Sequence, residues 1–351
     1  MSLPRRPPRP LLGSGLGSGL GSGLGSGPEF DLIRAMLGES DDLPVEILVG
    51  PGDDAAVLDA GRLAVSCDIA VEGVHFRRDW LSPVEIGYRA AAAALSDLAA
   101  MAAVPVAVLL SYALPPGDVE SGAATALQRG AEEAARRVGA ALVGGDLSRS
   151  PGPLVLDVVV LGTASRPVLR SGARPGDELW VTGRLGASGA AVRLLERGER
   201  VSGALRDAYA RPVPRVGEAL WLQERSLLGA AIDLSDGLAS DARHLAAASS
   251  VCLVLEAGRI PLDPAMAAVA GSDEDALDLA LGGGEDYELL FAAPHGAVAG
   301  VAEGFLGRFA VPLTRVGRVV EGEGVALDRG GGDVEPVGPR GFDHFRGTAS
   351  R

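Results

Sequence analysis

A long helix is predicted by residues 82–101, which read SPVEIGYRAAAAALSDLAAM. Ser82 is a favoured N-cap residue, Pro83 suits the first helical position, and Glu85 completes a capping box. We expect the helix to end near Ala103, before Pro105. Most of its side chains are small, so we expect neighbouring elements to pack closely against it.

Asp97 lies inside this helix among small and apolar side chains. Burying an isolated carboxylate opposes folding unless a cation or hydrogen-bond donors compensate it. We therefore favour the interpretation that Asp97 points into a cavity or an ion site. The alternative is that Asp97 belongs to the polar side that an amphipathic helix turns to solvent.

Other carboxylates stand where a short apolar run or a glycine turn ends: Asp54, Asp68, Asp146, Asp233 and Asp236. Hard cations such as Mg²⁺ take oxygen ligands and bridge to phosphates, so these acids predict a metal–nucleotide site if they converge. Each one alone also fits a surface turn or a helix cap. Residues 183–189, GRLGASG, join a predicted strand to a helix as phosphate-cradling loops do, although such glycines often serve only the turn.

The chain contains no lysine, because all 32 of its Lys+Arg residues are arginine. This excludes a P-loop and a protein-kinase type of site, both of which place a lysine on the phosphates. It also excludes lysine nucleophiles and Schiff bases. If the protein transfers phosphate, metal ions and arginine must supply the positive charge.

Composition narrows the functional classes further. The net charge of -14 argues against nucleic-acid binding, which needs a basic surface. Cys67 and Cys252 are too few for a disulfide scaffold or a thiolate zinc site, so we expect a cytoplasmic protein. No apolar run reaches the ~20 residues that a membrane span requires.

The 351 residues have room for two domains. Residues 1–28 form an Arg/Pro-rich segment followed by Leu-Gly-Ser-Gly repeats, for which we expect no fixed structure. We expect an N-terminal domain over residues 29–165 and a C-terminal domain over residues 166–346. Expected strands are 45–49, 55–58, 63–67, 106–114, 141–143, 154–164, 178–182, 230–234, 252–256, 287–293 and 314–320. Expected helices are 30–37, 83–103, 119–138, 187–197 and 238–248. This mixture predicts the α+β or α/β class rather than a regular doubly wound sheet.

Together these segments resemble the thiamine-monophosphate kinase family, part of the superfamily that includes aminoimidazole ribonucleotide synthetase and selenophosphate synthetase. The resemblance spans almost everything from residue 29 to 345. Its motifs are GDD at 52–54, SCD at 66–68 with EGVHF at 72–76, LSDLAAM at 95–101, GGD at 144–146, RSGARPGD at 170–177, IDLSDGL at 232–238 and GGEDYEL at 283–289.

The resemblance implies a two-domain aminoimidazole ribonucleotide synthetase-like fold whose N-terminal domains pair in a homodimer. It implies ATP-dependent phosphorylation of thiamine monophosphate to thiamine diphosphate with several Mg²⁺ ions. The metal ligands that the resemblance implies are Asp54, Ser66, Cys67, Asp68, Asp97, Asp146, Asp233 and Asp236. The residues that it implies for ATP binding are Gly145, Asp146, Arg170 and Ser235. Those that it implies for binding of thiamine monophosphate are His75, Glu285 and Phe342.

Two positions depart from the family pattern. Cys67 replaces the usual Thr, which is harmless if this residue serves a metal through its carbonyl but weakens the site if a hydroxyl is needed. Phe342 replaces Trp or Tyr, so stacking is kept while a polar atom is lost. We infer direct in-line transfer, because the phosphate of the acceptor is already a competent nucleophile and needs no strong general base.

Two alternative functions stay open. One is that of another ATP-using member of the superfamily. Selenophosphate synthetase is disfavoured because no Cys precedes Cys67, and the purine enzymes match residues 72–76 and 283–289 less well. The other is a catalytically inactive nucleotide-binding scaffold, against which the retention of every matched Asp argues.

Deletion of residues 2–27 is expected to leave fold and turnover intact, because a Gly/Ser-rich repeat buries almost no surface. Kinetics and sedimentation of the truncated protein check this. Loss of activity or of the native oligomer would assign the segment a structural role.

Overall fold

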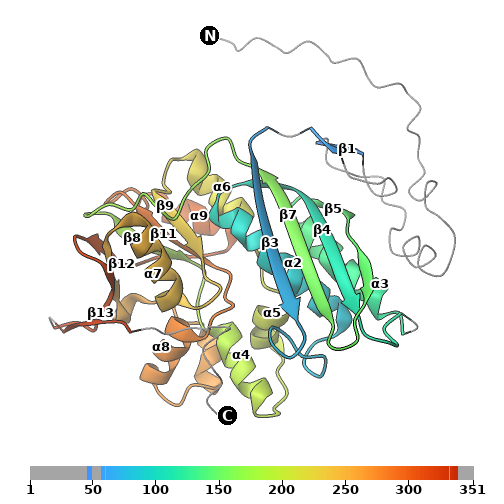
Figure 1. Ribbon diagram of the computed structural model, residues 1–351. Helices are drawn as coiled ribbons and strands as arrows, with labels where there is room; N and C mark the ends of the chain where they lie inside the picture. The colour runs from blue at the N-terminus through green and yellow to red at the C-terminus, as the bar shows by residue number, and fades with distance from the viewer. Residues whose placement is uncertain (1–45, 50–56, 60, 120, 332, 339–351) are drawn as a thin grey trace, which may run out of the picture.

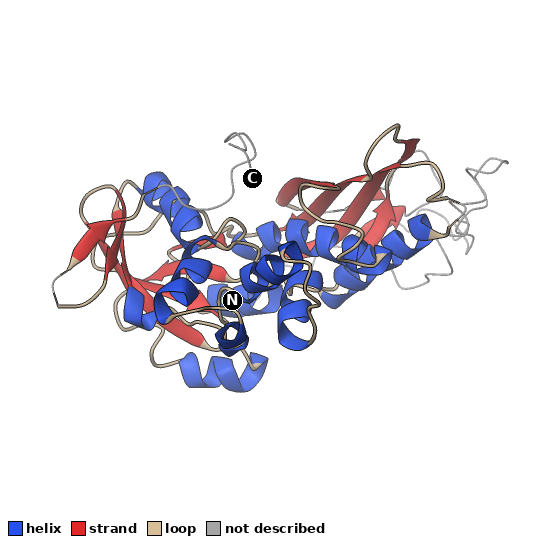
Figure 2. Cartoon of the chain, turned by 90° about the horizontal axis from the view of Figure 1, so that it is seen from below, coloured by secondary structure: helices blue, strands red, loops and turns tan. Residues whose placement is uncertain are grey.

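The computed structural model describes residues 46–49, 57–59, 61–119, 121–331 and 333–338. In the described residues, two large sheets of five and seven strands lie beside a small two-stranded one, and helices occupy the middle of the molecule between the large sheets (Figures 1 and 2). The predicted mixture of helices and strands is confirmed. The expected helix at 30–37, the segment 1–28, Asp54 and Phe342 lie outside the described residues.

The N-terminal elements are β1 (Ile47–Val49), β2 (Val57–Leu58), β3 (Leu63–Val71), α2 (Pro83–Ala100), β4 (Val104–Leu114), α3 (Ala123–Arg137), β5 (Ala141–Gly144), β6 (Leu147–Arg149) and β7 (Val155–Thr163). The main sheet has the order β3-β7-β4-β5, with β6 also paired to β4. β5 and β6 run parallel to β4, and the other pairs are antiparallel. Helices α2 and α3 cover one face of this sheet (Figure 1).

The C-terminal elements are β8 (Glu178–Thr182), α4 (Ala187–Glu196), α5 (Gly203–Ala210), α6 (Val216–Glu224), β9 (Ala230–Asp233), α7 (Leu238–Ser249), β10 (Cys252–Glu256), η1 (Ala257–Arg259), η2 (Pro264–Ala268), α8 (Asp273–Gly282), β11 (Leu289–Ala293), α9 (Ala302–Phe309), β12 (Leu313–Val320), β13 (Gly324–Asp328) and β14 (Val334–Pro336). Their sheet has the order β14-β13-β10-β12-β8-β11-β9.

Both faces of the C-terminal sheet are buried. Along β11, Leu290 packs in the cluster that contains α7 and α8, whereas Phe291 packs in the cluster that contains α6 and α9. Strand side chains alternate between faces, so a strand covered on both sides becomes a continuous apolar run. This explains the sequence of β11, in which all five residues are buried.

Helix α2 lies between the two sheets and contacts β3, β4 and β7 on one side and β9, α5 and α6 on the other. Its capping box forms as predicted: the Ser82 backbone N–H donates to Glu85 Oε2 at 2.8 Å, and the Ser82 hydroxyl accepts from the Glu85 backbone N–H at 3.4 Å. The helix ends at Ala100 rather than near Ala103, because Ala102 adopts a positive φ of 47°. One helix therefore packs against both halves of the chain.

Several elements have no counterpart in the sequence expectations: β6, α5, α6, α8, α9, β13 and β14. Most are short, and α6 shows little helical periodicity because its apolar residues are spread around the helix. Helix α8 did carry a local signal, since Ser272 caps it and accepts from the backbone N–H of Asp275 at 3.2 Å. In the described part of the chain, no helix is long and apolar enough to cross a membrane.

Helices α2 and α3 approach so closely that only glycine fits at their crossing. A Cβ on Gly87 would lie 1.8 Å from the Leu127 carbonyl oxygen, and one on Gly130 would lie 1.9 Å from that of Val84. Both obstacles are backbone atoms, so a side-chain rotation cannot relieve the clash.

Replacing Gly130 with Ala is expected to lower the free energy of unfolding by about 3 kcal/mol or more, because the two helices must move apart. Gly304→Ala in α9 is the control, since nothing lies within 4 Å of its added Cβ and alanine favours a helix. Urea unfolding of both variants measures the difference. Equal stability of the two would contradict the close contact.

Candidate functional site

Strand β3 presents two candidate ligands to helix α2. Side chains alternate along β3, so Ser66 and Asp68 share the half-buried face while Cys67 lies on the exposed one. The Ser66 hydroxyl donates to Asp97 Oδ2 at 2.5 Å, which joins the strand to the helix. Asp97 therefore points toward other candidate ligands.

Asp233, at the end of β9, brings a third carboxylate from the C-terminal sheet. Burial and the charge of Asp97 raise its pKa to about 7, and Asp68 adds to the effect. Burial, Asp97 and Asp157 raise the pKa of Asp68 to about 6. The buried Ser96 hydroxyl lies close enough to lower the pKa of Asp233, although it makes no hydrogen bond of full geometry within the described residues. The structure thus brings Asp68, Asp97 and Asp233 into one electrostatic cluster.

This acid cluster (Asp68, Asp97 and Asp233) fits a hard cation by its chemistry. Its donors are carboxylate oxygens with a serine hydroxyl beside them, and concentrated negative charge is what a divalent ion relieves. Arg170 is the cation that lowers the pKa of Asp233, but it is exposed. Within the described ranges, no three His, Cys, Asp or Glu side chains already form a compact metal group. The cluster is an open arrangement rather than a closed ligand cage.

The Cys67 side chain does not face the acid cluster. Its thiol donates to Asp157 Oδ1 at 3.0 Å on the exposed face of the sheet, and this hydrogen bond raises the pKa of the thiol. Because Ser66 and Asp68 point to the opposite face, the thiol cannot join them in binding one ion. Of the two roles left open for Cys67, the one through its thiol is therefore disfavoured, and the one through its carbonyl stays a prediction.

Gly145 and Asp146 lie elsewhere on the N-terminal sheet. β5, which Asp146 follows, is three positions from β3, so at about 4.8 Å per strand the two strands lie about 14 Å apart across the sheet. Gly145 packs against β4, where a Cβ would lie 1.9 Å from the Leu110 carbonyl oxygen. The Asp146 carboxylate is exposed and accepts from the Leu147 backbone N–H at 2.9 Å. Asp146 therefore does not form part of the acid cluster.

The turn after β9 holds a carboxylate that the sequence analysis missed. Asp241 is 2% exposed, and its Oδ2 accepts from the Asp236 backbone N–H at 3.1 Å. Burial and the charges of Asp233 and Asp236 raise the pKa of Asp241 well above its usual range. An acid in the first turn of a helix is ordinarily explained by the helix dipole, so its sequence position gave no stronger signal. Asp241 fixes the turn that carries Ser235 and Asp236.

The segment 284–288 (the acid loop) lies against the same turn. Glu285 and Tyr287 have φ values of 62° and 50°, a region that costs non-glycine residues energy. The Glu285 backbone N–H donates to the Ser235 carbonyl at 2.7 Å, and that of Tyr287 donates to the Leu234 carbonyl at 2.8 Å. The Glu285 carboxylate pairs with Arg89 of α2, a residue that sequence reasoning also missed.

The glycine loop at 183–189 is not free to cradle a phosphate at the start of α4. Both carboxylate oxygens of Asp286 accept from the Gly186 backbone N–H at 3.0 Å. The Ser188 backbone N–H also lowers the pKa of Asp286, although burial raises it overall. Of the two interpretations left open for these glycines, the structure favours the one in which they serve the turn, because an internal carboxylate occupies the anion position at this helix.

His75 lies in the turn between β3 and α2. Its Nδ1 accepts from the Val71 backbone N–H at 3.0 Å, and the Gly73 backbone N–H donates to the Phe76 carbonyl at 2.8 Å. The side chain is half-buried, so the hydrogen bond fixes the ring without enclosing it.

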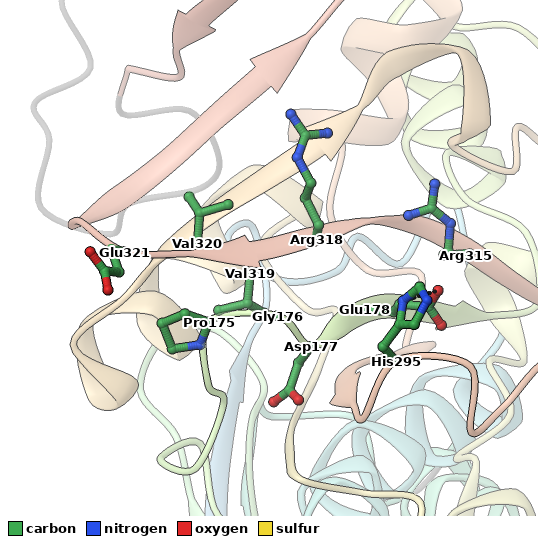
Figure 3. A pocket seen from close by; sticks show the side chains of 10 residues that line it. All are labelled: Pro175, Gly176, Asp177, Glu178, His295, Arg315, Arg318, Val319, Val320 and Glu321. Atoms are coloured by element: carbon green, nitrogen blue, oxygen red, sulfur yellow. Dashed lines mark ion pairs between the residues drawn. The ribbon is translucent and has the colours of Figure 1, made fainter.

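A hollow of about 470 Å³ lies at the other end of the C-terminal sheet (Figure 3). Along β11, Leu289 pairs with Asp233, whereas Ala293 pairs with Glu178, which lines the hollow. Arg315 and Arg318 at its wall pair with Glu256. None of the candidate site residues that the structure describes lines this hollow, so it is separate from the acid cluster.

Comparison with known proteins identifies the family. The family model for the N-terminal domain of AIR synthase related proteins matches residues 52–164. The family model for their C-terminal domain matches residues 174–329. These matches confirm the predicted two-domain architecture. The thiamine-monophosphate kinase of Escherichia coli (strain K12) is 36% identical over 331 residues, which cover 90% of this chain and 98% of that protein.

Solved structures agree with the sequence comparison. The thiamine-monophosphate kinase from Stenotrophomonas maltophilia K279a superimposes with a TM-score of 0.76 at 36% identity, covering 87% of this chain and 97% of that one. A structure described as AaThiL complexed with AMPPCP and TMP gives a TM-score of 0.70 at 31% identity, covering 90% and 96% of the two chains. The chain belongs to the thiamine-monophosphate kinase family.

Proposed function

We propose that the protein is a kinase that uses ATP to phosphorylate thiamine monophosphate to thiamine diphosphate. The observation that carries the proposal is the acid cluster, in which carboxylates of both domains converge beside α2. Membership of the thiamine-monophosphate kinase family supports the same activity, as does a relative in complex with AMPPCP and TMP.

We infer that Mg²⁺ ions bind the carboxylates of Asp54, Asp68, Asp97, Asp146, Asp233 and Asp236, with Ser66 and the Cys67 carbonyl contributing. Bound Mg²⁺ neutralises phosphate charge and orients the transferring group. The raised pKa values of Asp68 and Asp233 support this role, since they reflect negative charge that the protein itself leaves uncompensated. The sequence contains no lysine, so metal ions are also needed to supply positive charge beside the phosphates.

The other proposed contacts divide between the two substrates. Gly145, Asp146, Arg170 and Ser235 contact ATP, and His75, Glu285 and Phe342 contact the acceptor. The acceptor phosphate attacks the γ-phosphorus in line and displaces ADP, so the protein positions the two anions and requires no strong general base. The hydrogen bonds of Asp236 and Glu285 to neighbouring segments support a rigid, preformed turn for this task.

Two alternatives make different predictions. Another ATP-using superfamily member would release ADP with a different acceptor, whereas an inactive scaffold would bind nucleotide without turnover. Assays with thiamine monophosphate test the proposed activity, and assays with the acceptors of the other superfamily members, beside nucleotide binding, separate the two alternatives.

We further propose a homodimer in which the N-terminal domains (residues 29–165) pair and the C-terminal domains (residues 166–346) lie outside. The exposed face of β3 supports this pairing. Leu63, Val65 and Ile69 are 47%, 60% and 58% exposed on one strand, which is unusual for apolar side chains in one row.

Asp97→Asn is expected to abolish turnover while the fold persists, because the amide keeps the shape of the side chain but removes the charge that holds Mg²⁺. Asp328→Asn is the control, since Asp328 pairs with Arg318 on a distant strand. ADP release and thermal unfolding are measured for both variants. Wild-type turnover of Asp97→Asn at saturating Mg²⁺ would remove Asp97 from the metal site.

Val65→Asp is expected to dissociate the dimer, because it places a charge in the apolar row of β3. Leu306→Asp on α9 is the matched control, since Leu306 is 48% exposed on another domain. Sedimentation velocity measures both. The proposed pairing fails if Val65→Asp stays as dimeric as the control, or if the native protein is a monomer.

A further inference from the structure

Arg89 is a buried cation in the middle of α2. It is 5% exposed, it forms an ion pair with Glu285, and it donates to the Tyr209 carbonyl. Its guanidinium carbon also lies 4.2 Å from the centroid of the Tyr209 ring. A side chain of the N-terminal domain thus holds the carboxylate of a loop in the C-terminal domain.

The acid loop needs this contact for its side chain, not for its backbone. Hydrogen bonds to the Ser235 and Leu234 carbonyls already fix the backbone at positive φ. They leave the Glu285 side chain free to rotate, and the ion pair with Arg89 sets where its carboxylate points. The Glu285 side chain stays 28% exposed, so a ligand can still reach it. An ionised carboxylate can accept hydrogen bonds from more than one donor.

Arg89 and Asp97 stand eight residues apart on α2. At 1.5 Å per residue the helix separates them by about 12 Å along its axis, and at 100° per residue their directions differ by about 80°. The same rigid helix therefore positions Glu285 through Arg89 and supplies an acid of the cluster through Asp97.

We propose that Arg89 is a positioning residue for acceptor specificity: it holds the Glu285 carboxylate where it accepts a hydrogen bond from the amino group of the acceptor's pyrimidine ring. The inference rests on the proposed function and names the part of the acceptor that is recognised. Asp97 and its neighbours act at the phosphate end of the acceptor, and the pair of Arg89 with Glu285 acts at the ring end.

The test compares Arg89→Met, Arg89→Lys, Glu285→Gln and the double variant Arg89→Met/Glu285→Gln. KM and kcat are measured with ATP, thiamine monophosphate and oxythiamine monophosphate, in which a carbonyl oxygen replaces the pyrimidine amine. Arg193→Met is the control, because it removes a 2.7 Å ion pair with Asp275 between α4 and α8. Thermal unfolding of each variant is recorded alongside.

Arg89→Met is expected to raise KM for thiamine monophosphate about tenfold or more and to leave KM for ATP unchanged, as for a lost charge-assisted hydrogen bond. The preference for the amine over the carbonyl analogue is expected to fall by a similar factor. Arg89→Lys is expected to recover part of the affinity for thiamine monophosphate and part of the preference for the amine. An ammonium keeps the positive charge but lacks the planar guanidinium that can donate to two partners at once. The double variant is expected to be no worse than the poorer single one.

The inference is overturned if folded Arg89→Met and Arg89→Lys keep the wild-type KM and discrimination, or if the effects of the two single changes add in full. If Arg89→Met does not fold, Arg89→Lys and the double variant, which removes both charges, decide by the same criteria. Absence of any acceptor-dependent turnover in the wild-type protein overturns the proposed function itself, and the role of Arg89 with it.

Discussion

The rest of the structure depends on one constraint: three negatively charged side chains are held close together in a largely buried part of the molecule. Asp68, Asp97 and Asp233 come from β3, α2 and β9, and the pKa values of Asp68 and Asp233 rise because burial and neighbouring carboxylates disfavour their ionised forms. Such an arrangement opposes folding in the absence of a cation. The chain tolerates it because the elements that carry the acids are fixed elsewhere by apolar packing on both faces of α2.

Small residues make that packing possible. Gly87 and Gly130 let α2 and α3 touch backbone to backbone, and the alanines of α2 let strands of both sheets approach it. The helix then serves two purposes, because it presents Asp97 to the acid cluster and Arg89 to the acid loop. Two buried carboxylates fix further segments: Asp241 fixes the turn after β9, and Asp286 accepts hydrogen bonds from the backbone at the start of α4. Placement of the functional groups therefore depends on polar contacts within the C-terminal domain and on the ion pair of Arg89 with Glu285, which joins the two domains.

Local signals allowed much of the fold to be predicted. The start of α2 and all of β8 and β10 follow from a capping box and from short apolar runs. Helix α6 and strands β13 and β14 were missed because tertiary packing, not local pattern, stabilises them. The candidate acids were found by their positions after apolar runs. Arg89 was not found, because its partner Glu285 is distant in sequence, and Asp241 was not found, because an acid in the first turn of a helix is ordinarily explained by the helix dipole.

The central claim is that the acid cluster serves phosphoryl transfer between ATP and thiamine monophosphate. Phosphorus NMR of the wild-type protein with both substrates and Mg²⁺ tests it most directly. The account predicts that the γ-phosphate of ATP disappears as thiamine diphosphate and ADP appear in equal amounts, without free phosphate, and that a chelator stops the reaction. Conversion of ATP to ADP and free phosphate regardless of the acceptor, or full turnover in the presence of the chelator, would contradict it.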